Sequence, residues 1–287
     1  MKPPPFSYAC PDSVAEALAL LAEAGDGAKL LAGGQSLVPL LNLRMAWADA
    51  VIDLNRLSEL DFIVQENGTL RVGALTRHRT LEVSDTVRTA QPLMARAAGE
   101  VGHLAIRNRG TIGGSLVHAD PAAEWPLVAV TLDAELLLRS HTGSRTVAAR
   151  DFFVGPLTTT IEPDELLCEI RLPVAPERTR WGFQELCRRP GDFAIAAVAC
   201  QLTLDDSQTC RAASLAVAGA HDVPLAVAEV AACLVGSRGE DAALAEAADR
   251  AAAAVDPPSD VHGSADFRRR MVRVLSRRAL DQAWQSS

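Results

Sequence analysis

The sequence predicts a mixed α+β protein built from two or three structural units. At 287 residues the chain is long for one compact domain. Two glycine-rich segments, AGGQS at 32–36 and TIGGS at 111–115, each follow an apolar or extended run that is typical of a strand. Beyond Pro173 and Pro176 the composition changes to long strand patterns followed by Ala-rich helices, so we expect a linker near residue 176.

The first unit opens with a helix. Residues 12–24 place Leu and Ala at helical spacing, behind an Asp or Ser cap and before Gly25. A short strand at 29–32 then leads into the first glycine segment, and Ser36 is placed to cap a second helix through Leu43. The apolar run 51–54 predicts the returning strand.

Two hairpins and several helices follow. The runs within 61–75 flank Asn67-Gly68, a pair suited to a tight primed turn, and the runs 134–139 and 145–149 suggest a second hairpin. Helical patterns cover the residues 79–85, 92–102 and, after Asp120-Pro121, 122–132.

The last part of the chain predicts strands at 180–187, 193–205 and 211–219, followed by helices. In the final segment, 265–285, arginines fill most of the positions between the apolar residues. This basic face on an acidic protein is open to two interpretations, a surface that meets a partner or a solvated helix face.

Charge and cysteine content exclude several classes. The net charge of −8 disfavours binding to nucleic acid or to a membrane surface. No apolar stretch is long enough to span a bilayer, and the first residues lack the apolar core of a signal peptide, so we expect a cytoplasmic chain. The six cysteines are scattered without a C-x-x-C pair, which predicts free thiols and no metal or iron–sulfur site in this chain.

The two glycine segments indicate where a ligand binds. A phosphate oxygen needs backbone N–H groups brought close without a Cβ in the way, and Ser36 and Ser115 supply a hydroxyl at the end of each segment. Two such segments facing one another can hold a dinucleotide by its pyrophosphate. Neither fits G-x-x-x-x-G-K-[ST], and no complete G-x-G-x-x-G opens a helix. The pair therefore favours a flavin-binding protein over a nucleotide hydrolase.

At this point the chain resembles the FAD-binding medium subunits of the molybdenum hydroxylases, which include carbon monoxide, xanthine, quinoline and nicotine dehydrogenases. The stretches that carry the resemblance are LLAGGQSLVPLLNLRMA at 30–46, IRNRGTIGGSLVHADPAAEWP at 106–126, ARDFF at 149–153, RRPGDFAIAAVA at 188–199 and SADFRRRM at 264–271. The resemblance spans essentially the whole chain. It implies a vanillyl-alcohol-oxidase-type FAD-binding fold in two subdomains, residues 1–57 and 58–176. A C-terminal α+β domain of antiparallel sheet plus helices, residues 177–287, follows; it is of the carbon monoxide dehydrogenase flavoprotein type.

The resemblance also implies which residues hold the cofactor. Those that wrap the diphosphate and the ribityl chain are Lys29, Leu30, Leu31, Ala32, Gly33, Gly34, Gln35, Ser36, Thr111, Gly114 and Ser115. Glu124, where many relatives have Asp, binds a sugar hydroxyl, and Leu167 lies near the flavin. Phe193 stands where relatives often place Tyr against the isoalloxazine ring, and its aromatic face is sufficient for stacking. The alternative for Phe193 is a core residue of a strand.

The segment after the second glycine pair contains His118 and Asp120, which we also place beside the cofactor. We do not interpret them as an acid–base pair, because Asp120-Pro121 is suited to shaping a turn. Arg107 and Arg109 are open to three interpretations: neutralising the diphosphate, touching a neighbouring subunit, or facing solvent.

The function implied by the resemblance is that of an electron-transfer subunit. FAD on this chain takes electrons from [2Fe-2S] clusters on a small subunit and passes them to an external acceptor. A large subunit carrying molybdopterin cytosine dinucleotide hydroxylates the substrate, and the whole is expected to be a dimer of heterotrimers. Gln35 and Ser115, where carbon monoxide enzymes carry His and Asn, favour an aromatic N-heterocycle as substrate.

Three alternatives stay open. The chain could be the medium subunit of a carbon monoxide or aldehyde dehydrogenase, a self-contained FAD oxidase, or a scaffold whose flavin site is vestigial. Intact glycines in both segments argue against the last of these. The acceptor also stays open among quinone, cytochrome, oxygen and NAD.

Overall fold

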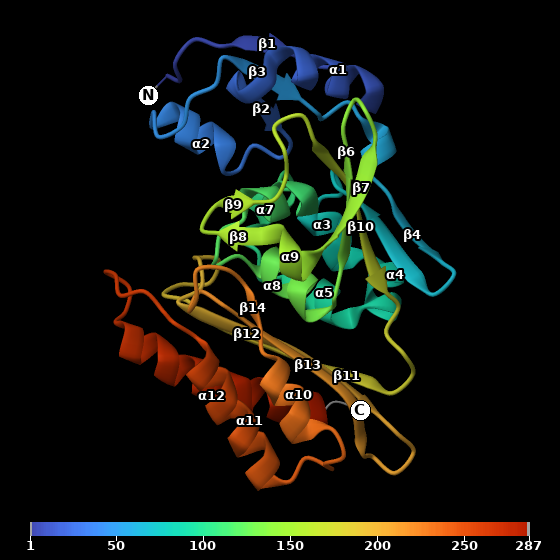
Figure 1. Cartoon of the computed structure of the whole chain (residues 1–287), viewed down its shortest axis with the longest axis vertical. Helices are drawn as coiled ribbons and strands as arrows, with labels where there is room; N and C mark the ends of the chain where they lie inside the picture. The colour runs from blue at the N-terminus through green and yellow to red at the C-terminus, as the bar shows by residue number, and fades with distance from the viewer. Residues whose placement is uncertain (1, 286–287) are drawn as a thin grey trace.

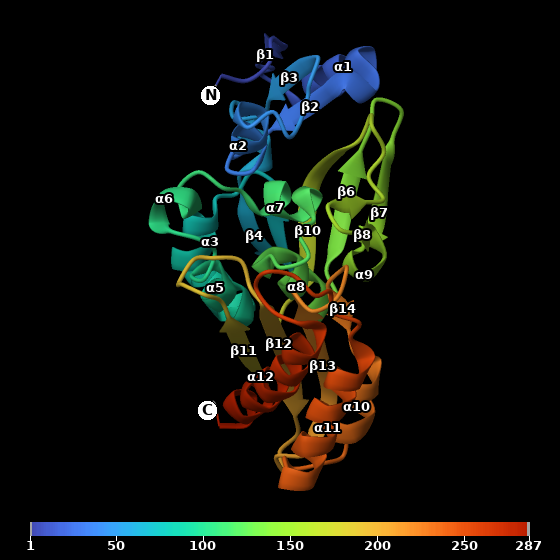
Figure 2. The ribbon, with the colours of Figure 1, turned by 90° about the vertical axis from the view of Figure 1, so that its left-hand side faces the viewer.

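Three sheets follow one another along the long axis of the molecule (Figure 1), and each is built mainly from one part of the chain. The computed structural model describes residues 2–285. The N-terminal sheet lies at one end, the largest sheet in the middle and the C-terminal sheet with its helices at the other end (Figures 1 and 2). This is the α+β fold that the sequence predicts.

The N-terminal sheet is parallel, in the order β1-β3-β2. Its elements are β1 (Ser7–Ala9), α1 (Val14–Ala24), the 3-10 turn η1 (Gly25–Gly27), β2 (Ala28–Leu31), α2 (Leu37–Asn42) and β3 (Ala50–Asp53). Ser13 caps α1 by accepting a hydrogen bond from the Glu16 amide at 3.2 Å, as expected. Ser36 does not cap α2: its backbone is already helical, so its hydroxyl is not aimed at the amides of the first turn.

The middle sheet is antiparallel, in the order β4-β5-β10-β6-β7. Its strands are β4 (Ile63–Glu66), β5 (Thr69–Gly73), β6 (Glu135–Arg139), β7 (Ser144–Ala148) and β10 (Leu166–Pro173). Both predicted hairpins are confirmed, and the positive φ of Asn67 (49°) and Gly68 (75°) is that of the primed turn. The central strand β10 was not predicted, because Glu169 and Arg171 interrupt its apolar pattern. In the fold, the Glu169 carboxylate pairs with Arg71 of β5 at 2.7 Å.

Short helices cover this sheet. They are η2 (Ser58–Leu60), α3 (His78–Val83), α4 (Asp85–Ala90), α5 (Pro92–Ala98), α6 (Leu104–Arg107), α7 (Ile112–His118), α8 (Glu124–Thr131) and α9 (Ala149–Phe152), with a small ribbon of β8 (Phe153–Gly155) and β9 (Thr158–Thr159). Ser84 starts a separate helix, α4, because its hydroxyl accepts from the Val87 amide. The predicted helix at 92–102 ends at Ala98, where a turn through Gly99 begins.

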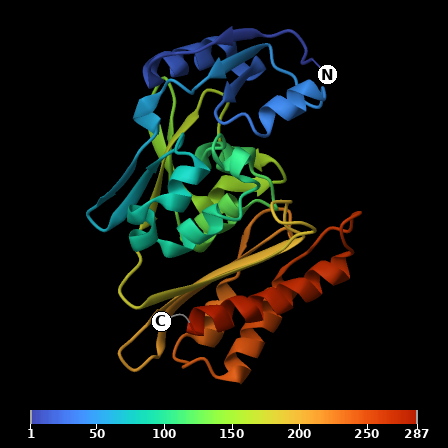
Figure 3. The ribbon, with the colours of Figure 1, turned by 180° about the vertical axis from the view of Figure 1, so that it is seen from behind.

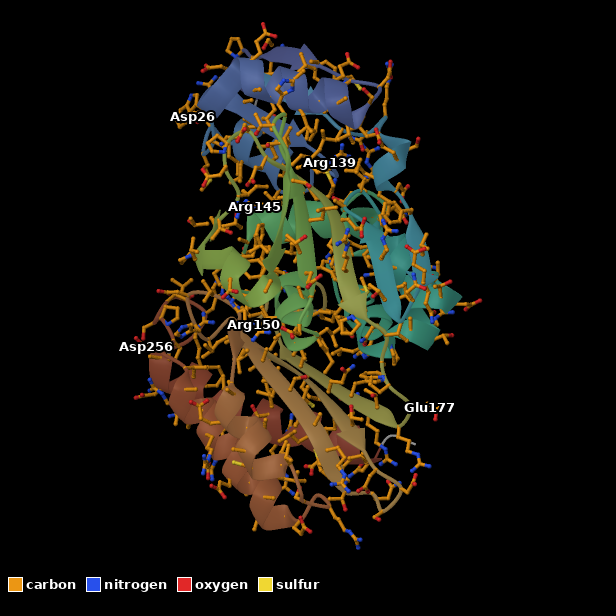
Figure 4. The ribbon with its side chains drawn as sticks, turned by 45° about the vertical axis from the view of Figure 1, so that its right-hand side comes forward. Asp26, Arg139, Arg145, Arg150, Glu177 and Asp256 are labelled. Carbon is orange, nitrogen blue, oxygen red and sulfur yellow. The ribbon has the colours of Figure 1, made fainter. Side chains whose placement is uncertain are left out.

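The C-terminal sheet is antiparallel, in the order β11-β12-β13-β14. Its elements are β11 (Thr179–Leu186), β12 (Ala196–Leu204), β13 (Cys210–Ala218), β14 (Leu225–Ala226), α10 (Ala228–Leu234), α11 (Asp241–Ala254) and α12 (Ala265–Gln285). One face packs on α5 and α8 of the middle unit, while α10 and α12 cover the other (Figure 3). The connection from β10 to β11 carries Glu177 (Figure 4).

The arginines of α12 do not form one free basic face. Arg269, Arg273 and Arg277 each pair with an aspartate on α11 or on α12 itself. These pairs favour the solvated-face interpretation of the helix. Among residues 2–285, no helix is long and apolar enough to cross a membrane.

Candidate functional site: two glycine segments in contact

The first glycine segment is a turn whose backbone N–H groups are free to donate to a ligand. It follows β2, and Gly34 has a φ of +72°, which favours glycine. Across residues 2–285, no acceptor is found for the backbone N–H groups of 33–36. The Gln35 amide nitrogen donates back to the Gly33 carbonyl at 3.0 Å, which closes the turn from within. A row of N–H donors at a strand end is therefore available to a ligand.

The second glycine segment differs from the prediction, since it opens a helix and does not follow a strand. Thr111 caps α7, and its hydroxyl accepts from the Gly114 amide at 3.1 Å. The Gly113 amide donates to the Ala74 carbonyl at 2.9 Å. Because these amides are already bonded, the segment offers the partly exposed Ser115 hydroxyl and close backbone packing instead.

The two segments lie against one another. A Cβ added at Gly33 would clash with the Arg109 carbonyl and lie 2.6 Å from the Gly110 Cα. A Cβ at Gly114 would lie 2.8 Å from the Thr111 hydroxyl and 3.6 Å from the Ala32 Cβ. Glycine at 33 is thus required by the approach of one segment to the other.

Two residues that the sequence analysis missed tie the segments together. The Asn55 side-chain amide donates to the Ala32 carbonyl at 2.9 Å, and Arg77 donates to the Asn55 side-chain oxygen at 2.7 Å. A second nitrogen of Arg77 donates to the Arg109 carbonyl. Burial lowers the pKa of Arg77, and the charge of Arg109 lowers it further. Asn55 follows the carboxyl end of a parallel strand, a place where ligands often bind, but no local pattern marks Arg77.

A buried histidine packs against the start of the second glycine segment. His78 contacts the backbone at Gly110, where an added Cβ would lie 2.6 Å from the imidazole Nε2. The Trp125 indole donates to His78 Nδ1 at 2.9 Å. Burial and the charges of Arg77 and Arg107 lower the pKa of His78 to about 3, so the ring is neutral and serves packing.

The turn after α7 brings a second group of candidates into place. Asp120 Oδ1 accepts from the Ala122 amide at 2.9 Å, which is the turn-shaping role expected for Asp120. Glu124 begins α8 with only 8% of its surface exposed. Burial raises the pKa of Glu124 to about 7, with the charges of Glu100 and Asp120 adding to the rise. His118 lies on the last turn of α7.

The remaining predicted residues come from other elements. Leu167 is buried in β10, Lys29 is exposed on β2, and Phe193 lies in the loop before β12 with 62% of its surface exposed. The strand-core interpretation of Phe193 is therefore wrong. The Arg107 side chain has partners within the chain: it donates to Glu82 at 2.9 Å and to the carbonyls of Val101 and Gly102.

The pattern of donors fits the diphosphate of a dinucleotide such as FAD. The unpaired N–H groups of 33–36, the positive φ of Gly34 and the hydroxyls of Ser36 and Ser115 are what a diphosphate requires. Within 2–285, no group of three His, Cys, Asp or Glu side chains is placed to hold a metal ion.

Comparison with known proteins shows the family of the chain. Residues 4–175 match the family described as "FAD binding domain in molybdopterin dehydrogenase", and residues 181–283 match "CO dehydrogenase flavoprotein C-terminal domain". The chain is 42% identical to the 6-hydroxypseudooxynicotine dehydrogenase complex subunit alpha of Paenarthrobacter nicotinovorans, covering 99% of this chain and 96% of that one.

Two solved structures superpose closely. Carbon monoxide dehydrogenase from Hydrogenophaga pseudoflava gives a TM-score of 0.96 at 38% identity, and quinoline 2-oxidoreductase from Pseudomonas putida 86 gives 0.94 at 37%. Each covers 99% of both chains. The chain belongs to the FAD-binding subunits of the molybdenum hydroxylases. It is an oxidoreductase subunit whose cofactor is FAD and whose role is electron transfer.

Proposed function

We propose that the chain holds the FAD diphosphate between the 32–36 turn and the start of α7, within units 1–57 and 58–176. The observation that carries this proposal is the row of N–H groups at 33–36 that have no acceptor in the described chain. Those groups donate to the diphosphate, and the hydroxyls of Ser36 and Ser115 complete its shell. Bound FAD would supply the electron-accepting isoalloxazine ring.

The other site residues take the remaining parts of the cofactor. Residues 29–32 and Thr111 lie along the ribityl chain, and Glu124 accepts from a sugar hydroxyl. His118 and Asp120 lie beside the cofactor, and Leu167 packs near the ring. Phe193 stacks on the ring, and its exposed aromatic face leaves room for such a contact.

The chain works within a larger complex. One relative is named as a subunit of a dehydrogenase complex, and another, 37% identical, as the medium chain of carbon monoxide dehydrogenase from Hydrogenophaga pseudoflava, which supports partner subunits here. We propose a small subunit with [2Fe-2S] clusters and a large subunit with molybdopterin cytosine dinucleotide, assembled as a dimer of heterotrimers. A cytoplasmic location suits the six free cysteines, because a reducing compartment maintains thiols.

The substrate that we propose for the complex is an aromatic N-heterocycle. Gln35 and Ser115 support this class, as does the likeness to a quinoline oxidoreductase and a 6-hydroxypseudooxynicotine dehydrogenase subunit. The carbon monoxide dehydrogenase structure is as similar to this chain as the quinoline oxidoreductase structure, and a glyceraldehyde dehydrogenase medium chain from Sulfolobus acidocaldarius is 39% identical. Carbon monoxide and aldehydes are therefore the compounds to compare.

The test begins with the native mass of the complex purified from its own host. We expect two partner chains, with FAD, iron–sulfur and molybdopterin masses in the same spectrum. A lone 30.4 kDa chain with FAD would contradict the partner proposal. Turnover of quinoline, carbon monoxide and glyceraldehyde with an artificial acceptor then separates the substrate classes, and activity on the last two alone would overturn the heterocycle assignment.

A further inference from the structure

Arg268 is the buried cation of the C-terminal unit. It lies near the start of α12, in the SADFRRRM stretch, and only 4% of its surface is exposed. One terminal nitrogen donates to the Ile195 carbonyl at 2.5 Å and to the Gly219 carbonyl at 2.7 Å. The other pairs with Asp260 at 2.7 Å. A single guanidinium therefore joins α12 to the neighbouring ends of β12 and β13, which are paired in the sheet.

One of those two points, Gly219, is hydrogen-bonded to the FAD-binding unit. Ile195 ends the 187–195 loop, two residues after Phe193. Gly219 follows β13, and its amide donates to the Pro121 carbonyl at 2.8 Å, in the turn that leads to Glu124. Gly219 has a φ of +73°, and an added Cβ would lie 2.9 Å from the Ala194 carbonyl. Arg268 is thus hydrogen-bonded both to the loop that carries Phe193 and to Gly219, whose amide contacts the Pro121 turn.

Attachment of the helix alone does not explain this residue. Apolar side chains of α12 such as Leu275 and Leu280 already fasten it to the sheet. A buried charge is costly unless it is well paired, and here the Arg268 Nε has no acceptor within 2–285. The planar fork of arginine can reach two carbonyls and a carboxylate together, which lysine cannot do.

We propose that Arg268 is a positioning residue that holds the 187–195 loop, and with it Phe193, in place against the FAD-binding unit. The placement of Phe193 on the flavin rests on the proposed function, whereas the placement of the loop does not.

The first test needs no cofactor. Amide hydrogen exchange is measured on the full chain with Arg268→Lys, at Ile195 and Gly219, whose amides are bonded to Leu186 and Pro121. We expect exchange at both amides to be about tenfold faster, because hydrogen bonds to a charged group are lost. The control is Arg269→Lys, an adjacent and more exposed arginine with the same change.

Two results would overturn the proposal: unchanged exchange at both amides, or an equal increase throughout α11 and α12, which would mark Arg268 as a general stabiliser. If Arg268→Lys does not fold, Asp260→Asn removes one partner at a position with 40% of its side chain exposed. The same localised increase is then expected, to a smaller degree.

The second test uses the FAD-loaded chain. The visible circular dichroism of the flavin is compared among Arg268→Lys, Phe193→Ala and the double variant. We expect each single change to alter the signal and the double variant to match Phe193→Ala, because Arg268 acts through Phe193. If the changes of the two single variants add in the double variant, Arg268 does not act through Phe193. An unaltered signal in Phe193→Ala, with fast exchange at Ile195 in Arg268→Lys, would refute the Phe193 contact while leaving the positioning of the loop supported.

Discussion

Gly33 shows how much of the site depends on the absence of one carbon atom. Its backbone lies against the carbonyl of Arg109 and the Cα of Gly110, which belong to a segment more than seventy positions away. A side chain of any size at 33 would push the two segments apart. The donors of the first turn would then move away from the second segment.

We expect Gly33→Ala to weaken FAD binding by about 5- to 150-fold, since overpacking costs about 1–3 kcal/mol and 1.4 kcal/mol is a factor of ten. The dissociation constant is measured by quenching of flavin fluorescence. Gly143→Ala is the matched control, because its φ is not positive and an added Cβ there meets nothing within 4 Å. Equal affinity for FAD in the two variants would contradict the close-approach argument.

At the scale of elements, the hydrogen bonds of Asn55 and Arg77 join the end of β3 to the start of α3 and to the second glycine segment. Lysine at 77 keeps the charge but cannot reach Asn55 and the Arg109 carbonyl together. We expect Arg77→Lys to weaken FAD binding by about tenfold, from the loss of charge-assisted hydrogen bonds.

Arg79→Lys is the control for that change, since Arg79 is exposed on the same helix and pairs with Glu82. Titration of each variant with FAD gives the comparison. If Arg77→Lys and Arg79→Lys bind FAD with equal affinity, the hydrogen bonds of Arg77 do not hold the segments together.

The β4–β5 hairpin offers a prediction about stability alone. Gly68 has a φ of 75°, which an L side chain rarely adopts, and open space surrounds it. Gly68→Ala should lower the free energy of unfolding by about 1 kcal/mol through backbone strain. Urea unfolding measures this loss, and FAD affinity should not change. A loss no larger than that of Gly143→Ala would argue against the primed turn.

At the scale of the whole molecule, the buried Glu124 and the partly buried Glu185 come from different units and interact electrostatically. Burial raises the pKa of Glu185 on β11 to about 8, and the charges of Glu124 and Glu100 add to the rise while Arg96 opposes it. Glu185 Oε2 has no acceptor or donor among the described residues. Both Glu124 and Glu185 therefore retain protons in the folded chain that the unfolded chain releases above about pH 4.5.

Stability should fall as the pH rises from about 4.5 to about 8, since over that interval the folded state binds protons that the unfolded state has lost. The rise in the pKa of Glu124 from 4.5 to about 7 corresponds to at most about 3 kcal/mol. We expect Glu124→Gln to flatten the decline between pH 5 and pH 8, measured by urea unfolding. Glu229→Gln, at an exposed position, is the control, and an unchanged slope in Glu124→Gln would refute this source of pH dependence.

The sequence alone determined the α+β class, both hairpins, the Ser13 cap and the pair of glycine segments. Each of these is encoded by neighbouring residues: a turn dipeptide, a capping hydroxyl, or an apolar period. The family resemblance could also be recognised from the sequence, because its motifs are contiguous in the chain.

Only the tertiary structure decided that the second glycine segment opens α7, that β10 is the centre of its sheet, and that Asn55, Arg77 and Arg268 connect the site. Arg268 and Ile195 are 73 positions apart, and Asn55 and Arg77 are 22 apart. No local pattern marks such pairs, because a hydrogen bond between distant residues depends on where the whole chain brings them and leaves no period in the sequence.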